Sequence, residues 1–69
     1  MDWAEQVTLV GALDRLSERD QTLLVALMES AHPSYTEISR TLSMPVESIG
    51  PTRGRALDRL RREYDALVA

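Results

Sequence analysis

Apolar residues recur at three- and four-residue steps along most of the chain, which is the spacing of one face of an α-helix. The first such stripe, on residues 3–16, consists of Val7, Leu9, Val10, Leu13 and Leu16. The second, on residues 18–29, consists of Leu23, Leu24, Leu27 and Met28. No stretch sustains the alternation of a strand, and Phe is absent. The N-terminal half is therefore expected to form two helices. Ser17 is expected to cap the start of the second helix, and Asp20, three residues later, can complete a short capping box.

The C-terminal half predicts a short helix followed by a long one. Pro33 interrupts the pattern, and Ser34 with Glu37 three residues later is typical of a capped helix start. The short helix spans residues 35–42, and residues 43–45 end it. Its inward positions are Tyr35, Ile38 and Leu42. The long helix has its apolar stripe on Ala56, Leu57, Leu60, Tyr64 and Leu67.

Two residues bear on where the long helix begins. In an unbroken helix from Val46, Arg53 falls within about 20° of Leu60, inside the apolar stripe, where an unpaired guanidinium is costly. Pro51 also clashes with a carbonyl unless it lies in the first turn. We therefore expect the regular helix to begin near residues 48–51, with Ser48 as its N-cap and residues 48–67 as its span.

The predicted fold is all-α: one domain over residues 1–69, with helices at about 3–16, 18–29, 35–42 and 48–67. A short helix, a tight turn and a longer basic helix are the parts of a helix-turn-helix, whose second helix lies in the major groove of DNA. The domain would belong to the winged-helix-like and homeodomain-like superclass. A generic four-helix bundle with a solvated charged face is the alternative.

Charge is distributed unevenly along the chain, whose formal net charge is −3. Residues 1–30 hold six acidic residues against two arginines, a balance of −4. Residues 51–62 hold five arginines against Asp58, a balance of +4, and a local basic stretch can hold phosphates while the rest of a domain repels them. All eight basic residues are arginine, which suits forked contacts with phosphate or guanine, although a GC-rich genome produces the same bias.

Three blocks of the sequence resemble, in order, region 4 of bacterial sigma factors. Residues 12–24 resemble the start of that region, and residues 34–46 resemble its first motif helix and turn. Residues 49–61 resemble the recognition helix of extracytoplasmic-function sigma factors of actinobacterial type. The resemblance covers residues 9–62. It implies a transcription-initiation domain that recognises the −35 promoter element, docks on the flap of the RNA polymerase β subunit and is covered by anti-sigma proteins.

On this interpretation, seven residues are expected to contact DNA. Arg55 matches an arginine that the family keeps, and Arg53 and Arg59 are expected to hold phosphates. Thr52 is expected to reach a thymine methyl group or a phosphate, and Ser48 to cap a helix end that attracts phosphate. On the preceding helix, the residues expected to hold the DNA backbone are Thr36 and Arg40.

The chain also departs from the family pattern. Ser43 occupies a turn position where the family often has Gly, which costs about 1 kcal/mol if the backbone there is left-handed. Glu47 also replaces a frequent Gly, and in a DNA-facing turn it would repel phosphate or accept from a cytosine amino group. Residues 50–52 stand where many relatives have Arg-Ser-Arg, which removes two expected DNA contacts.

Several other classes of function receive less support. Without Cys, and with His32 as the single histidine, we expect no metal site, no cofactor and no enzyme activity. No apolar run approaches a membrane span, so we expect no membrane partner and a cytoplasmic location. Two alternatives stay open: a sigma-like domain that mainly binds protein, either an anti-sigma factor or the polymerase flap, and a small stand-alone regulator of the response-regulator output type.

Overall fold

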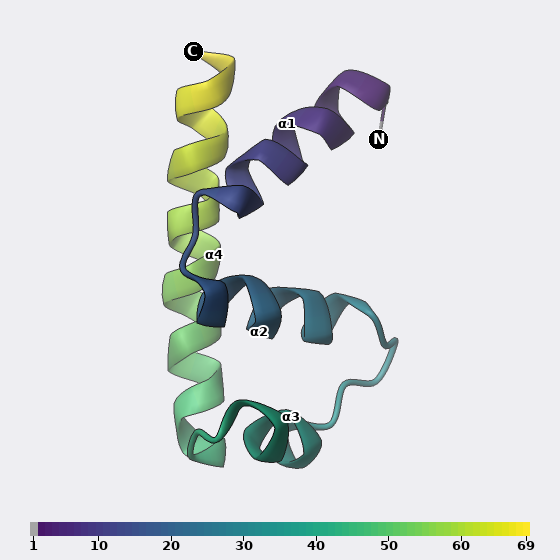
Figure 1. Ribbon diagram of the computed structural model, residues 1–69, viewed down its shortest axis with the longest axis vertical. Coiled ribbons are helices and arrows are strands. Elements are labelled where there is room, and N and C mark those ends of the chain that lie inside the picture. The colour runs from purple at the N-terminus through teal and green to yellow at the C-terminus, as the bar shows by residue number, and fades with distance from the viewer. Residues whose placement is uncertain (1) are drawn as a thin grey trace.

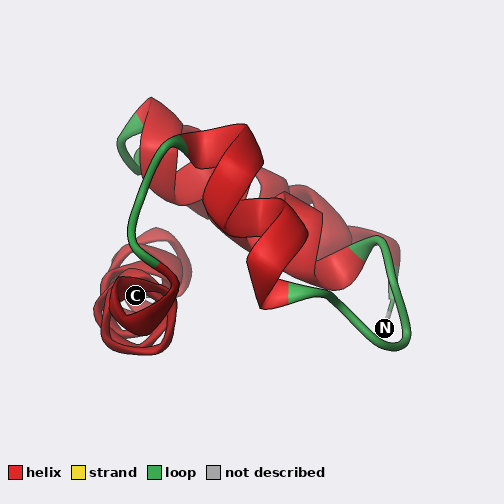
Figure 2. Cartoon of the chain, turned by 90° about the horizontal axis from the view of Figure 1, so that it is seen from below, coloured by secondary structure: helices red, strands yellow, loops and turns green. Residues whose placement is uncertain are grey.

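A computed structural model describes residues 2–69, which form four helices and no strand (Figure 1). In chain order the helices are α1 (Trp3–Asp14), α2 (Glu18–Met28), α3 (Tyr35–Leu42) and α4 (Val46–Val68). The long helix α4 runs the length of the molecule, and seen end-on it has the other three helices on one side (Figures 1 and 2). The all-α, four-helix prediction is thus confirmed over these residues, and none of the four helices is long and apolar enough to cross a membrane.

Three short polar residues start the first three helices. The side chains of Asp2, Ser17 and Ser34 each accept a hydrogen bond from the backbone N–H three residues later, at 2.9, 3.2 and 3.3 Å. Each bond satisfies one of the donors that a helix start leaves free. The caps predicted at Ser17 and Ser34 are therefore confirmed, and α1 has a third cap at Asp2.

The core consists of two small clusters joined through α2. Consecutive residues on a helix point about 100° apart, so Leu23 and Leu24 of α2 enter different clusters. Leu24 packs with Leu16 at the end of α1 and with Ala56 of α4. Leu23 packs with Ile38 of α3 and Ile49 of α4. The helix α2 therefore fixes both α1 and α3 against the same long helix.

Some residues expected in the core are exposed. Val7 and Val10 were placed on the inner stripe of α1, but they are 52% and 57% exposed, because α1 packs through the opposite side, which carries Ala12. Both sides of this helix are apolar, so spacing alone does not select the buried one. Met28 and Leu57 were also expected inside, yet both are exposed.

The predicted start of the last helix was wrong. The helix begins at Val46, directly after Pro45, and the N–H of Ser48 donates to the carbonyl of Pro45 at 3.0 Å. Ser48 is therefore in the first turn and is not the N-cap. Pro51 lies inside the helix and removes the donor for the carbonyl of Glu47. Both residues are exposed, so water is available to that carbonyl.

An unbroken α4 accommodates Arg53 because the buried side of the helix is centred on neighbouring positions, which leaves the Arg53 side chain in solvent. The buried residues of the first three turns are Ile49, Thr52 and Ala56, and Arg53 lies at the edge of this stripe with its side chain exposed. The prediction placed Arg53 inside the apolar stripe because it falls within about 20° of Leu60. Thr52 is one of the buried residues, and Arg53 next to it is exposed.

Candidate nucleic-acid interface

The turn between α3 and α4 is held by one serine, Ser39. Its carbonyl accepts from the backbone N–H groups of Ser43 and Met44, the latter at 3.1 Å, and its hydroxyl donates to the carbonyl of Met44. These bonds enclose Ser43, which has φ 53° and ψ 45°. The left-handed conformation considered for this position is thus present, and a non-glycine residue adopts it at a cost of about 1–2 kcal/mol. The role of Ser39 was not predicted from the sequence.

Two of the predicted DNA-contacting residues share the outer side of α3. Thr36 and Arg40 are both exposed and lie four residues apart, on the side opposite the buried Ile38. The structure therefore presents both side chains to solvent along one line, where they are accessible to a partner.

Three arginines form a row along one side of α4, and we call Arg55, Arg59 and Arg62 the basic row. At about 100° per residue they lie within about 60° of one another, and Ser48 is aligned with them two turns before Arg55. All three arginines are exposed, and Ser48 is partly buried. The structure thus aligns three predicted site residues, namely Ser48, Arg55 and Arg59. Helical spacing had already placed Arg62 on the side of Arg55, although it was not among the residues expected to contact DNA.

The basic row borders a hollow of about 350 Å³ at the junction of α2 and α4. Two aspartates share this hollow with the three arginines: Asp20 in the first turn of α2 and Asp58 on α4. Asp58 is 3.8 Å from Arg62, measured from Oδ2 to Nη2. The five side chains together carry a formal charge of +1. The sequence did not predict that Asp20 lies beside α4, because its position there depends on how α2 packs against α4.

Thr52 does not lie on the exposed face, contrary to expectation. Its exposure is 3%, and its hydroxyl accepts a hydrogen bond from Nη2 of Arg55 at 3.4 Å. A side chain buried to this extent is not presented to a base or a phosphate, so its position gives no support to the expected direct contact, which stays a prediction. Through this hydrogen bond Thr52 contacts Arg55, the first arginine of the basic row.

Arg53 lies on a different side of α4 from the basic row. It is two residues from Arg55, and in an unbroken helix this turns the two side chains about 160° apart. A single DNA backbone therefore cannot engage both arginines from one direction. The acidic Glu47 and Asp58 lie between the two sides and are exposed.

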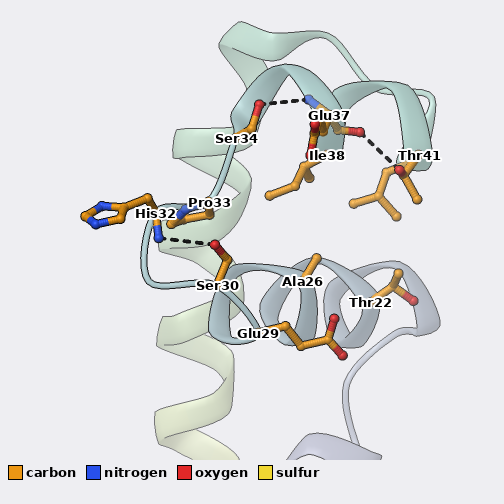
Figure 3. A pocket seen from close by; sticks show the side chains of 11 residues that line it. Thr22, Ala26, Glu29, Ser30, His32, Pro33, Ser34, Glu37, Ile38 and Thr41 are labelled. Carbon is orange, nitrogen blue, oxygen red and sulfur yellow. Dashed lines mark hydrogen bonds between the residues drawn. The ribbon is translucent and has the colours of Figure 1, made fainter.

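A pocket of about 610 Å³ separates α2 from the loop and helix α3 (Figure 3). Two of its hydroxyl groups bond the backbone of Glu37: Ser34 accepts from the N–H at 3.3 Å, and Thr41 donates to the carbonyl at 3.0 Å. The His32 ring points away from the pocket (Figure 3). Within residues 2–69, no three His, Cys, Asp or Glu side chains are grouped to hold a metal ion.

The outer side of α1 carries a second surface of different character. Trp3, Val7 and Val10 lie on the side opposite α4, and with Gln6 they line a hollow of about 300 Å³. Trp3 is 78% exposed. We call these three apolar residues the α1 stripe. A contiguous apolar surface of this kind is typical of a protein-binding face.

Comparisons with known proteins identified no relative. No protein-family model matches the chain, and no curated protein or solved structure matches it either.

Proposed function

We propose that this chain is a DNA-binding domain of the sigma factor region 4 type, which recognises the −35 promoter element and docks on RNA polymerase. The observation that carries the proposal is the arrangement of α3, the three-residue turn at Ser43–Pro45 and the arginine-bearing α4. A short helix and a longer basic helix joined by a turn of this length are the parts of a helix-turn-helix. In that motif the second helix enters the major groove.

The charge distribution supports the same function. Helices α1 and α2 together carry four acidic residues against one arginine, a balance of −3, whereas α4 carries five arginines against four acidic residues, a balance of +1. The helix α4 would therefore attract DNA more than α1 and α2 do. Exposed Thr36 and Arg40 on α3 would hold the backbone that flanks the groove.

The test is selection of DNA by the 69-residue chain itself. A pool of random duplexes is enriched on the immobilised protein, and the affinity for the enriched duplex is compared with that for a scrambled one between about 50 and 200 mM salt. We expect preference for the enriched sequence and an affinity that falls steeply with salt. Binding with neither preference nor salt dependence contradicts the proposal.

A second candidate function, a protein-interaction module, is favoured by the α1 stripe. Its exposed Trp3, Val7 and Val10 offer an apolar surface that the rest of the chain leaves uncovered. On this alternative the domain binds the polymerase flap or an anti-sigma factor and binds DNA only weakly.

Trp3 provides a direct readout for this alternative, because it is the single tryptophan of the chain. Adding a tryptophan-free flap domain is expected to shift its fluorescence to the blue if the α1 stripe becomes buried. Val7→Asp should abolish the shift, and Val25→Asp, at an exposed valine of α2, is the matched control. A flap that binds without changing Trp3 fluorescence excludes the α1 stripe as the docking face.

A further inference from the structure

We propose that Asp58 and Asp20 are built-in competitors for the basic row, so that DNA phosphates must displace or outweigh their carboxylates to bind. This inference rests on the proposed DNA binding and concerns how strongly α4 holds phosphate. The arginines of the hollow would be partly neutralised in the free protein, and the two aspartates would set its affinity.

The Asp58–Arg62 pair has the features of an exchangeable contact. The two residues lie four apart on α4, their charged atoms are 3.8 Å apart, and their side chains are 79% (Arg62) and 71% (Asp58) exposed. Exposed pairs of this kind are weak, and a phosphate can replace the carboxylate at the guanidinium. Asp58 therefore lowers the charge of the basic row without blocking access to it.

Asp20 places a second carboxylate beside the hollow. Its side chain is 19% exposed and lies 3.9 Å from Arg19, measured from Oδ1 to Nε. Its backbone N–H is fixed by the Ser17 cap at the start of α2, and a helix start favours a carboxylate. The packing of α2 on α4 thus places this carboxylate beside the hollow.

The charges of the hollow suggest what this arrangement achieves. Three arginines alone would bind any polyanion tightly, whereas a formal charge of +1 leaves the hollow dependent on contacts elsewhere in the interface. The expected consequence is weaker binding to non-specific DNA, since such DNA is held by phosphate contacts alone.

The experiment compares Asp58→Asn with Asp65→Asn. Both changes remove one negative charge from an exposed position on α4, but Asp65 does not line the hollow. Each variant is titrated with random-sequence duplex DNA, and separately with inorganic phosphate while the arginine side-chain N–H signals are followed by NMR. We expect Asp58→Asn to tighten both interactions by about two- to five-fold, the range of a weak surface pair, and to steepen the salt dependence for DNA by at most about one.

Each outcome decides the inference. A gain for Asp58→Asn clearly above that for Asp65→Asn supports it, and equal gains overturn it by showing that only net charge matters. If no variant binds DNA, the proposed function fails, and the phosphate titration then decides: tighter phosphate binding by Asp58→Asn upholds the competition, and unchanged binding overturns it.

Discussion

The helices α1 and α4 pack against each other, yet their outer sides have opposite chemistry. Away from α4, α1 exposes Trp3, Val7 and Val10, whereas the outward side of α4 carries arginines and acidic residues. Charged side chains are solvated at little cost, so α4 is stable with its outer side in water. Exposed apolar side chains gain free energy when a partner covers them, so the two helices point to different kinds of partner.

The comparison also concerns how the two helices were predicted. On α4, charged residues occupy the outer side, so the sequence leaves few choices for the side that is buried. On α1, apolar residues occupy two opposite sides, so the sequence does not show which of them is buried. Which side packs is then decided by close approach: Ala12 lets α1 lie against α4, and Gly11 lies next to Leu67, which a Cβ atom at that glycine would contact at 3.4 Å.

The largest expected effect is on the free energy of unfolding, and it compares a residue on the buried side of α4 with one on the outer side of α1. Ile49→Ala should lower the free energy of unfolding by about 2–5 kcal/mol, because Ile49 is fully buried and its loss leaves a cavity. Val10→Ala should change it by about 0.5 kcal/mol or less. Urea unfolding followed by circular dichroism measures both, and comparable losses would mean that the outer side of α1 is packed after all.

The next effect concerns the two sides of α4 in DNA binding. Arg55→Ala should weaken binding and reduce the salt slope by about one, because one phosphate contact is lost. Arg53→Ala should have the smaller effect, since Arg53 lies about 160° away from Arg55 around the helix. Fluorescence anisotropy at several salt concentrations measures both variants, with unchanged circular dichroism as the folding control. Equal losses would require an interface that wraps around α4.

How much of this site follows from the sequence depends on the kind of information needed. Local signals gave the caps at Ser17 and Ser34 and the short helix after Pro33, because those interactions span only three residues. The spacing of the arginines likewise placed Arg55 and Arg59 on a common side of the helix. These properties depend on helical periodicity alone and need no tertiary contact.

Other properties required the packed structure. Thr52 was expected to flank the outer face of the helix and to contact DNA, but it is buried, and its hydroxyl accepts a hydrogen bond from Arg55. Asp20 reaches the basic row only through the packing of α2 on α4, which no local pattern encodes. The start of α4 was placed too late because Arg53 was expected inside the apolar stripe, whereas it is exposed at the edge of the buried side.

A smaller effect tests the turn that connects α3 to α4, in which Ser43 has a left-handed backbone conformation. No such residue lies at either end of α1. Ser43→Gly should raise the free energy of unfolding by about 1 kcal/mol, because glycine adopts the left-handed conformation without the strain of a side chain. Ser39→Ala should lower it by about 1 kcal/mol through loss of the hydroxyl bond to Met44. Urea unfolding detects both changes, and a destabilising Ser43→Gly would show that the Ser43 side chain contributes more than its backbone strain costs.

The smallest expected effect concerns the ion pair that joins α1 to α4. Nη1 of Arg15, at the end of α1, lies 3.3 Å from Oε2 of Glu63 on α4, and the side chain of Arg15 is 51% exposed. Arg15→Gln should therefore lower the free energy of unfolding by about 0.5 kcal/mol or less, and by still less in high salt. Arg61→Gln, which removes a charge from an exposed site on α4, is the control. A loss several times larger than that of the control, and insensitive to salt, would mean that the ion pair, and not the apolar contact around Ala12, holds the two helices together.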